Sequence, residues 1–144
     1  MLSKLLVAFS LMAACVAIHA MGLTAVFRRR HVRLARQTQN VWAPAWTLIR
    51  IASWVVFLHL AQSRVWALMY AWRGAMADFT TAAYFSAVTY TTTGYGDFVL
   101  PEAWRLVGGV EALTGILMCG LSTGMFFVVF SAVFDLSRKI GNPS

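Results

Sequence analysis

The stretch Thr91-Thr92-Thr93-Gly94-Tyr95-Gly96-Asp97 is the most informative part of this chain. It lies between two long apolar segments, where a re-entrant loop that lines a pore would be found. Backbone carbonyls aimed at one axis can replace the water around a monovalent cation, provided that alternate residues adopt unusual dihedral angles. Gly94 and Gly96 can do so because they lack a Cβ atom. A glycine-rich turn is the alternative, and it is disfavoured because irregular backbone at membrane depth is tolerated where it lines a cavity.

The composition is that of a membrane protein. Of the 144 residues, 60% are hydrophobic and 12% are charged, whereas soluble domains are about one-quarter charged. The net charge of +7 does not indicate nucleic acid as a partner, because five of the 12 Lys and Arg residues gather in residues 28–36, after an apolar run. Such clusters stay on the cytoplasmic side. Cys15 and Cys119 lie in apolar segments, so we expect buried small hydrophobic residues and neither a disulfide nor a metal site.

Three long apolar segments predict three membrane-spanning helices, over residues 5–27, 46–72 and 103–134. A cleaved signal peptide is the alternative for the first segment, but its apolar run exceeds the usual ~7–15 residues. The basic cluster sets the orientation: the first helix runs inward, the second runs outward, and the third returns to the cytoplasm.

Residues 79–90 are expected to form a short helix between the second and third spans, with Asp78 as its N-cap. Its C-terminal end would point a partial negative charge at the pore cavity and favour a cation there. Asp97 is then expected to face outside, and the Thr92 hydroxyl would add an oxygen ligand at the inner end. Tyr95 would point away from the pore axis and brace the segment.

Residues 79–136, extended by the second helix to residue 46, resemble the pore domain of potassium channels. The signature of that family is Thr-x-Gly-Tyr-Gly-Asp, and Thr93 stands where Val is usual. Residues 81–90 also look like small bacterial two-helix ion-channel proteins. The resemblance implies an all-α membrane protein with an outer helix, a re-entrant pore helix and filter, and an inner helix. It also implies that four copies assemble as a homotetramer, and we expect one additional N-terminal transmembrane helix before this fold.

The same resemblance divides the chain into residues 1–45 (N-terminal helix and basic cytoplasmic linker), 46–136 (pore domain) and 137–144 (short cytoplasmic tail). It implies a potassium-selective channel of the cell (inner) membrane, not an enzyme, with no cofactor besides the permeant K⁺. The filter that binds K⁺ would be Thr92, Thr93, Gly94, Tyr95 and Gly96. A poorly selective cation channel and a non-conducting assembly or sensor subunit are the alternatives. The intact Gly94-Tyr95-Gly96 sequence counts against both.

Residues near the filter depart from the family pattern. Tyr84 and Phe85 occupy two positions of the aromatic cuff where Trp is common. Tyr84 could donate a hydrogen bond to Asp97, whereas Phe85 has no polar hydrogen to offer Tyr95. Thr89 is the remaining candidate partner for the Tyr95 hydroxyl.

Gly115 of the third span has two possible roles. It stands where the family has a gating hinge, and close packing between helices explains it equally well. If Gly115 is the hinge, residues at helical spacing beyond it would line the pore cavity; these are Ile116, Cys119, Thr123 and Phe127.

Glu111 and Arg64 each interrupt an apolar helix, where a lone charge is costly. Counted from Trp104 and Trp72 as interfacial anchors, both lie about 10–12 Å deep at ~1.5 Å per residue. We therefore expect a mutual salt bridge. The alternatives are that Arg64 extends to the lipid headgroups and that Glu111 lines the cavity as a cation site. The second helix also has one polar face, which could widen the network: His59, Gln62, Ser63 and Trp66.

Arg30, Arg33 and Arg36 are spaced three residues apart, as in a voltage sensor. Their surroundings are too polar to remain inside a membrane, so we expect an amphipathic segment on the cytoplasmic surface with anionic lipid as its partner. The family's ligand-binding domains and four-helix voltage sensors have no counterpart in this sequence. We therefore expect gating by the bilayer, the filter or protonation.

Overall fold

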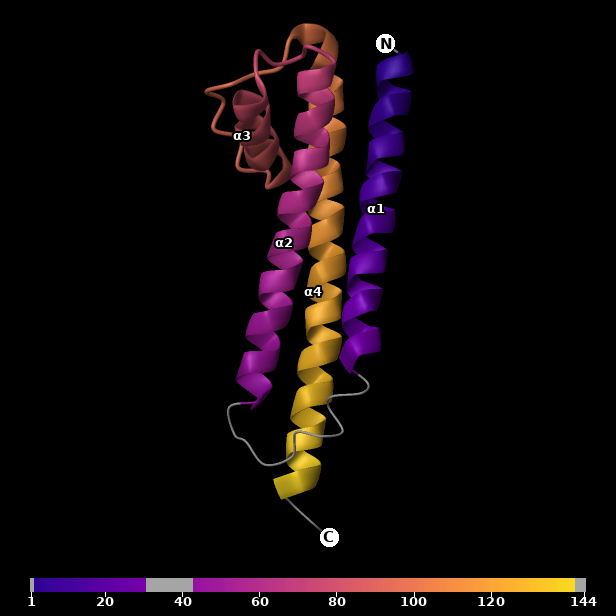
Figure 1. Ribbon diagram of the computed structural model, residues 1–144, viewed down its shortest axis with the longest axis vertical. Coiled ribbons are helices and arrows are strands. Elements are labelled where there is room, and N and C mark those ends of the chain that lie inside the picture. The colour runs from indigo at the N-terminus through magenta and orange to yellow at the C-terminus, as the bar shows by residue number, and fades with distance from the viewer. Residues whose placement is uncertain (1, 31–42, 142–144) are drawn as a thin grey trace.

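The computed structural model describes residues 2–30 and 43–141, and its regular structure there is all helical. The long helices are α1 (Leu2–Arg30), α2 (Ala43–Trp72) and α4 (Arg105–Gly141), and the short ones are α3 (Phe79–Tyr90) and the 3-10 turn η2 (Glu102–Trp104). Helices α1 and α4 run in the same direction and α2 runs in the opposite one (Figure 1). Helix α3 lies beside the C-terminal end of α2, at the same end of the molecule as the first residues of α1 and α4 (Figure 1). The connections before and after α3 therefore gather at that end.

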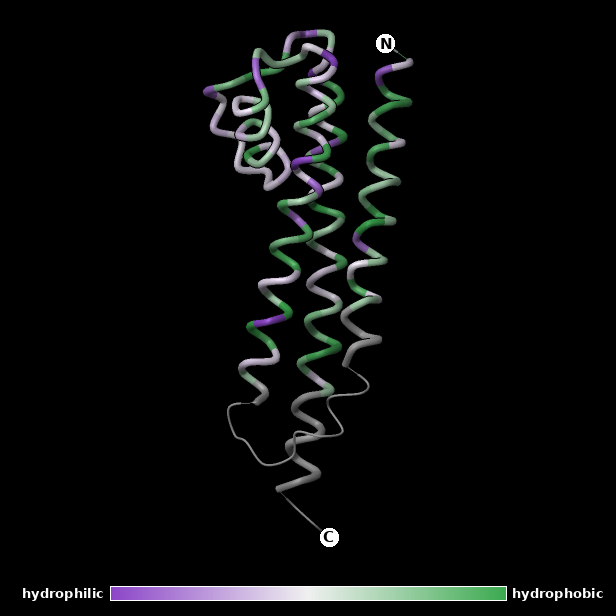
Figure 2. The backbone as a smooth tube through the Cα atoms, viewed as in Figure 1, coloured by the Kyte–Doolittle hydropathy of each residue, from purple (hydrophilic) through white to green (hydrophobic). Residues whose placement is uncertain are grey.

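Three helices are long and apolar enough to cross a membrane, over Leu2–Ala25, Ala45–Trp72 and Glu102–Ala132. Hydrophobic colours follow these helices in Figure 2, while hydrophilic colours concentrate in the connections around α3. The three predicted long apolar helices are therefore confirmed, and each is able to cross a membrane by its length and composition.

Helix α3 begins where the sequence predicts. The Thr81 amide donates to Asp78 Oδ1 at 2.9 Å, and the Thr81 hydroxyl donates to Asp78 Oδ2 at 2.8 Å. These bonds favour the ionised carboxylate and lower the pKa of Asp78. The helix buries one stripe at a spacing of four residues, which packs toward α2 and α4: Ala82, Ser86 and Tyr90.

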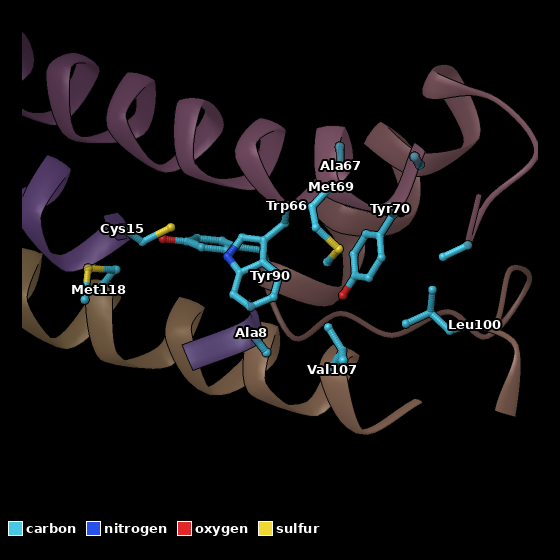
Figure 3. Close-up of a cluster of buried hydrophobic side chains, with 12 residues drawn as sticks. Ala8, Cys15, Trp66, Ala67, Met69, Tyr70, Tyr90, Leu100, Val107 and Met118 are labelled. Carbon is cyan, nitrogen blue, oxygen red and sulfur yellow. The ribbon is translucent and has the colours of Figure 1, made fainter. Parts of the chain in front are cut away.

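All four helices contribute to one core, which Figure 3 shows around Trp66. Trp66 and Tyr70 of α2 are fully buried, and α1 covers them from one side. The other labelled members are Ala8, Cys15, Ala67, Met69, Tyr90, Leu100, Val107 and Met118.

Helix α1 is attached to the rest of the protein near both ends. Lys4 Nζ lies 4.4 Å from the centre of the Trp104 ring, a cation–π distance. Near the other end, a Cβ atom on Gly22 would lie 2.7 Å from the Leu58 side chain, so α1 and α2 approach closely there. Trp54 Nε1 donates to the Gly22 carbonyl at 3.1 Å. Helix α1 is thus an integral part of the fold, with these partners on η2 and α2.

Candidate functional site

The segment from Thr91 to Asp97, which we call the candidate filter, follows α3 directly. Its backbone has left-handed φ at alternate residues: 59° at Thr92, 58° at Gly94 and 78° at Gly96. The two glycines were predicted to adopt such dihedral angles, but Thr92 was not singled out. A positive φ at a β-branched residue is a true outlier, and it persists only where the surrounding structure enforces it.

Three successive amides of the candidate filter turn back toward α3. Thr92 N donates to the Thr89 carbonyl at 2.9 Å, and the amides of Thr93 and Gly94 donate to the Val88 carbonyl at 3.0 and 3.3 Å. In a trans peptide the carbonyl of one residue points opposite to the amide of the next. The carbonyls that precede these amides, including those of Thr92 and Thr93, therefore point away from α3.

Side-chain hydrogen bonds support the start of the candidate filter. The Thr91 hydroxyl donates to the Ala87 carbonyl at 2.8 Å and lies 2.9 Å from the Thr93 hydroxyl. Because the single proton of Thr91 goes to a carbonyl, the Thr93 hydroxyl is the donor of the second bond. The extra polar group at Thr93, where the potassium-channel pattern has Val, thus has a partner within the chain.

The far end of the candidate filter is attached to α3 as well. Tyr84 Oη donates to Asp97 Oδ2 at 2.7 Å, which confirms the predicted hydrogen bond. This bond to a carboxylate raises the pKa of Tyr84. The other carboxylate oxygen accepts from the Phe98 amide at 3.1 Å. Asp97 is thereby held from both sides, and its role in supporting the filter stays a prediction.

The Tyr95 side chain, unlike that of Asp97, is not held by a hydrogen bond to α3 in the described part of the chain. Its side chain is 72% exposed, and in the described part of the chain no hydrogen bond joins it to Thr89, the partner that we expected. Thr89 instead borders a shallow pocket together with Phe85, Leu100 and Gly108.

Helix α4 has an exposed face. The residues expected to line a cavity all lie on this exposed face of α4, which we call the α4 stripe: Ile116, Cys119, Thr123 and Phe127. Phe127 is 71% exposed. Residues 91–99, which include the candidate filter, are likewise exposed. The candidate filter and the α4 stripe are therefore both uncovered in the single chain.

Gly115 is buried, on a side of α4 that packs against the end of α3. A Cβ atom there would come within 1.8 Å of the Tyr90 carbonyl oxygen, so only glycine lets α4 meet the end of α3. Helix α4 continues through this position without a break. Close packing therefore accounts for Gly115 in this structure, and a hinge at this residue stays a prediction. Gly109, Gly120 and Gly124 differ, since a Cβ atom on any of them would meet nothing within 4 Å.

The expected ion pair between Arg64 and Glu111 is corrected by the structure. Glu111 is fully buried, Arg64 is exposed, and no salt bridge joins them among residues 45–132. Glu111 instead accepts a hydrogen bond from Tyr70 Oη at 2.8 Å and contacts the Ser86 hydroxyl. Counting residues from an anchor gives the depth of a side chain but not the direction in which it points around the helix.

The hydrogen bonds of Ser86 indicate the form of Glu111. The Ser86 hydroxyl, which has one proton, lies against two acceptors: the Ser63 carbonyl at 2.5 Å and Glu111 Oε1. Because a carbonyl can only accept, all three groups are satisfied when Glu111 is protonated and donates to Ser86. A neutral Glu111 needs no cation nearby. We call Tyr70, Ser86 and Glu111 the Glu111 cluster, and it joins α2, α3 and α4 on the buried side.

The polar face of α2 does form a network, but its reach was not predicted. His59 and Gln62 contact His19 of α1, Tyr90 of α3 and Ser122 of α4. The sequence offered one signal for this wider network, namely the polar residues His19 and Ser122 inside the first and third apolar segments. Ser63 instead contributes its carbonyl to Ser86, and Trp66 belongs to the apolar core.

The basic segment lies mostly beyond the described part. Arg30 is the last residue of α1, while Arg33 and Arg36 lie outside the described residues.

Comparison with known proteins bears on most of this site. The family described as "Ion channel" matches residues 45–132, more than half of the chain. The match includes α2, α3, the candidate filter and most of α4, and α1 precedes it. The "Potassium voltage-gated channel protein Shal" of Drosophila melanogaster is 38% identical over 60 residues, which are 40% of this chain and 10% of that protein. This chain therefore matches only a small part of the length of that relative. No solved structure is significantly similar to this chain.

Proposed function

We propose that this chain, which belongs to the ion channel family and to its potassium-channel pore domains, is a potassium-selective channel. Dehydrated K⁺ would move down its electrochemical gradient through a pore that four copies of the chain form together. This family is not a class of enzymes, and passive conduction needs no cofactor besides the permeant ion.

The observation that carries the proposal is the left-handed φ at Thr92, Gly94 and Gly96. With three amides turned back to α3, the carbonyls on the other side are placed to act as ligands. The K⁺ ligands would be the carbonyls of Thr92, Thr93, Gly94 and Tyr95 together with the Thr92 hydroxyl. Gly96 would complete the filter.

A homotetramer is proposed because one chain supplies one wall of a pore. The exposure of the candidate filter and of the α4 stripe supports this, since a filter segment that faced only water or lipid would have no use for its alternating left-handed backbone. In the assembly the α4 stripe would surround the cavity. Ile116 and Phe127, 58% and 71% exposed in the single chain, would form apolar rings around it.

We place the protein in the cell (inner) membrane with the filter exit outside and the C-terminus in the cytoplasm. The parallel course of α1 and α4 supports this topology, because it brings Arg28–Arg30 and Arg138-Lys139 to the same side (Figure 1). Anionic lipid of that leaflet would attract the basic segment that contains Arg30, Arg33 and Arg36.

The test compares two glycines with the same backbone conformation. Gly94 and Gly74 have φ of 58° and 64°, and a Cβ atom on either would meet nothing within 4 Å. Ala at a left-handed position costs ~1–2 kcal/mol in both cases. Gly94→Ala is expected to lower K⁺ flux into liposomes about tenfold or more and to reduce the preference for K⁺ over Na⁺. Gly74→Ala, in the turn before α3, should leave both unchanged.

Bi-ionic reversal potentials of the unmodified protein provide the decisive measurement. Equal permeability to K⁺ and Na⁺ would show a poorly selective cation channel, and absence of any flux would favour a non-conducting subunit. Equal effects of Gly94→Ala and Gly74→Ala would remove the candidate filter from the conduction path.

A further inference from the structure

Five side chains from four helices close a ring of hydrogen bonds at the end of α3. His19 comes from α1, His59 and Gln62 from α2, Tyr90 from α3, and Ser122 from α4. All are buried except His59, which is half-buried. We call this set the His19 ring.

The orientation of Gln62 is fixed by α1. Gln62 Nε2 lies 3.1 Å from the Cys15 carbonyl and 3.2 Å from His19 Nδ1. Since a carbonyl can only accept, the amide nitrogen must face Cys15, and the amide oxygen then accepts from the Tyr90 hydroxyl. His19 Nδ1 is consequently an acceptor.

The remaining bonds follow in one direction. His19 carries its proton on Nε2 and donates to Ser122 Oγ at 3.0 Å, and Ser122 donates to His59 Nε2 at 3.1 Å. His59 carries its proton on Nδ1 and donates to Tyr90 Oη at 3.3 Å. Tyr90 in turn donates to Gln62, which closes the ring. Each member then donates and accepts around the ring without conflict, and bonds arranged in this way strengthen one another.

This pattern requires both imidazoles to be neutral. A proton added to His19 Nδ1 would face the amide donor of Gln62, which cannot turn because its oxygen would then face the Cys15 carbonyl. A proton added to His59 Nε2 would displace the hydroxyl proton of Ser122. The two rings lie 5.3 Å apart between centres, so charging both would also place like charges side by side.

The ring holds the residue from which the candidate filter starts. Tyr90 is the last residue of α3, and its carbonyl lies where a Cβ atom on Gly115 would be. Through His19, α1 thus joins the ring of hydrogen bonds that holds Tyr90. Helix α1 does so although it precedes residues 45–132, which match the family.

We propose that the His19 ring positions Tyr90 at the base of the filter and that its protonation lowers K⁺ conduction. Helix α1 then acts as a regulatory element that makes the channel sensitive to acid. The conduction part of this inference rests on the proposed function, whereas the protonation pattern of the ring does not.

Other titratable groups pack around the ring. Cys15 faces it from α1, and Glu111 and Cys119 lie along α4. Glu111 makes its hydrogen bonds to Tyr70 and Ser86 and to no member of the ring. On α2 the charged residues Arg50 and Arg64 are exposed. Imidazole is the group whose charge ordinarily changes in the mildly acidic range, so the two histidines account for the response that we propose.

The first test measures K⁺ flux into liposomes for the full chain from about pH 7.5 to about pH 5. If protonation removes one buried hydrogen bond, the population of the conducting form falls about tenfold. We therefore expect about a tenfold fall in flux at the acidic end. His19→Asn keeps an acceptor for Gln62 but cannot be protonated, so it should conduct at neutral pH with a reduced response to acid. The double variant with His59→Asn should lose the response altogether.

His19→Leu and His31→Gln serve as controls. His19→Leu leaves the Gln62 amide without its partner and should lower flux at every pH. His31→Gln changes the remaining histidine of the chain, which lies outside the described residues, and should keep the full acid response. An acid response that persists in the double variant, or its absence in the unmodified protein, would overturn the proposal.

The second test does not depend on conduction. Nitrogen NMR of the histidines of the full chain in lipid nanodiscs at neutral pH reports which ring nitrogen carries the proton. The expected result is Nε2–H at His19 and Nδ1–H at His59, and Ser122→Ala should perturb both signals. Opposite tautomers or a charged imidazole at neutral pH would refute the ring. If no flux is found at any pH, the proposed function fails while this result still decides the ring.

Discussion

The two sides of α3 differ in how far a single chain completes them. On the buried side, the hydroxyls of Ser86 and Tyr90 have hydrogen-bond partners on α2 and α4. On the other side, residues 91–99 are exposed and Tyr95 remains 72% accessible. Interactions within the chain therefore fix the position of α3, whereas the filter side stays uncovered and is the side that the proposed tetramer would cover. This difference predicts that folding and conduction can be disturbed separately.

The largest effect is expected at the contact between α3 and α4. Gly115→Ala places a methyl group 1.8 Å from the Tyr90 carbonyl oxygen, so the two helices must separate. Forcing extra volume into a packed site costs ~1–3 kcal/mol or more, and backbone cannot move aside as a flexible side chain can. Thermal unfolding of the purified protein in detergent should show a clear loss of stability, accompanied by loss of K⁺ flux.

Gly109→Ala is the matched control on the same helix, because its Cβ atom would meet nothing within 4 Å. It should unfold at an equal or higher temperature, since Ala favours a helix by up to ~1 kcal/mol over Gly. Equal losses in both variants would mean that α4 does not pack against α3 at Gly115.

An intermediate effect is expected at the Glu111 cluster. Glu111→Ala should destabilise the protein by ~1–3 kcal/mol, because Tyr70 Oη loses its acceptor and the Ser86 hydroxyl keeps only the Ser63 carbonyl. Glu111→Gln keeps a donor and an acceptor and should cost much less. Arg64→Gln should change stability by no more than ~0.5 kcal/mol, as at other exposed positions.

The double variant of Arg64→Gln and Glu111→Gln distinguishes this account from an ion pair. Independent sites give additive changes in unfolding free energy. A strong departure from additivity, with a cost of ~3–5 kcal/mol for either single change, would restore the buried salt bridge.

The smallest effect on folding is expected on the filter side of α3. Tyr84→Phe removes the hydroxyl that bonds Asp97, at a side chain that is 40% exposed. It should change the unfolding temperature little but lower K⁺ flux, because Asp97 loses one of its two partners. Ser86→Ala, two residues along the same helix, removes a buried hydroxyl and should cost ~1–3 kcal/mol. If both variants affect stability and flux in the same proportion, the two sides of α3 do not differ as proposed.

Features that depend on neighbouring residues were predicted well from the sequence. The bounds of α3 and its Asp78 cap agree because a capping side chain acts within one helical turn. The three spans follow from the length of apolar sequence. The bond from Tyr84 to Asp97 was also found, since the filter motif sets their separation.

Features that depend on rotation about a helix or on a distant segment were not predicted. Glu111 and Arg64 were matched by depth alone, and they point to different surroundings. The positive φ of Thr92 arises from amides that fold back to α3, which residue preferences do not reveal. His19 and Ser122 come together only because α1 and α4 run in parallel, and their separation along the chain hides this contact.

The parallel course of α1 and α4 has a consequence for protein engineering. The Cys15 carbonyl and His19 are partners of Gln62, and His19 is also a partner of Ser122. Deletion of α1 alone would take both partners from the Gln62 amide nitrogen and one of two partners from the Ser122 hydroxyl, in hydrocarbon where no water can replace the lost bonds. A two-helix version of this protein should therefore combine that deletion with changes to the remaining ring members as a set, because Gln62 and Ser122 also bond Tyr90 and His59. By the same reasoning, an ancestor could gain or lose α1 at low cost only together with changes in these polar residues.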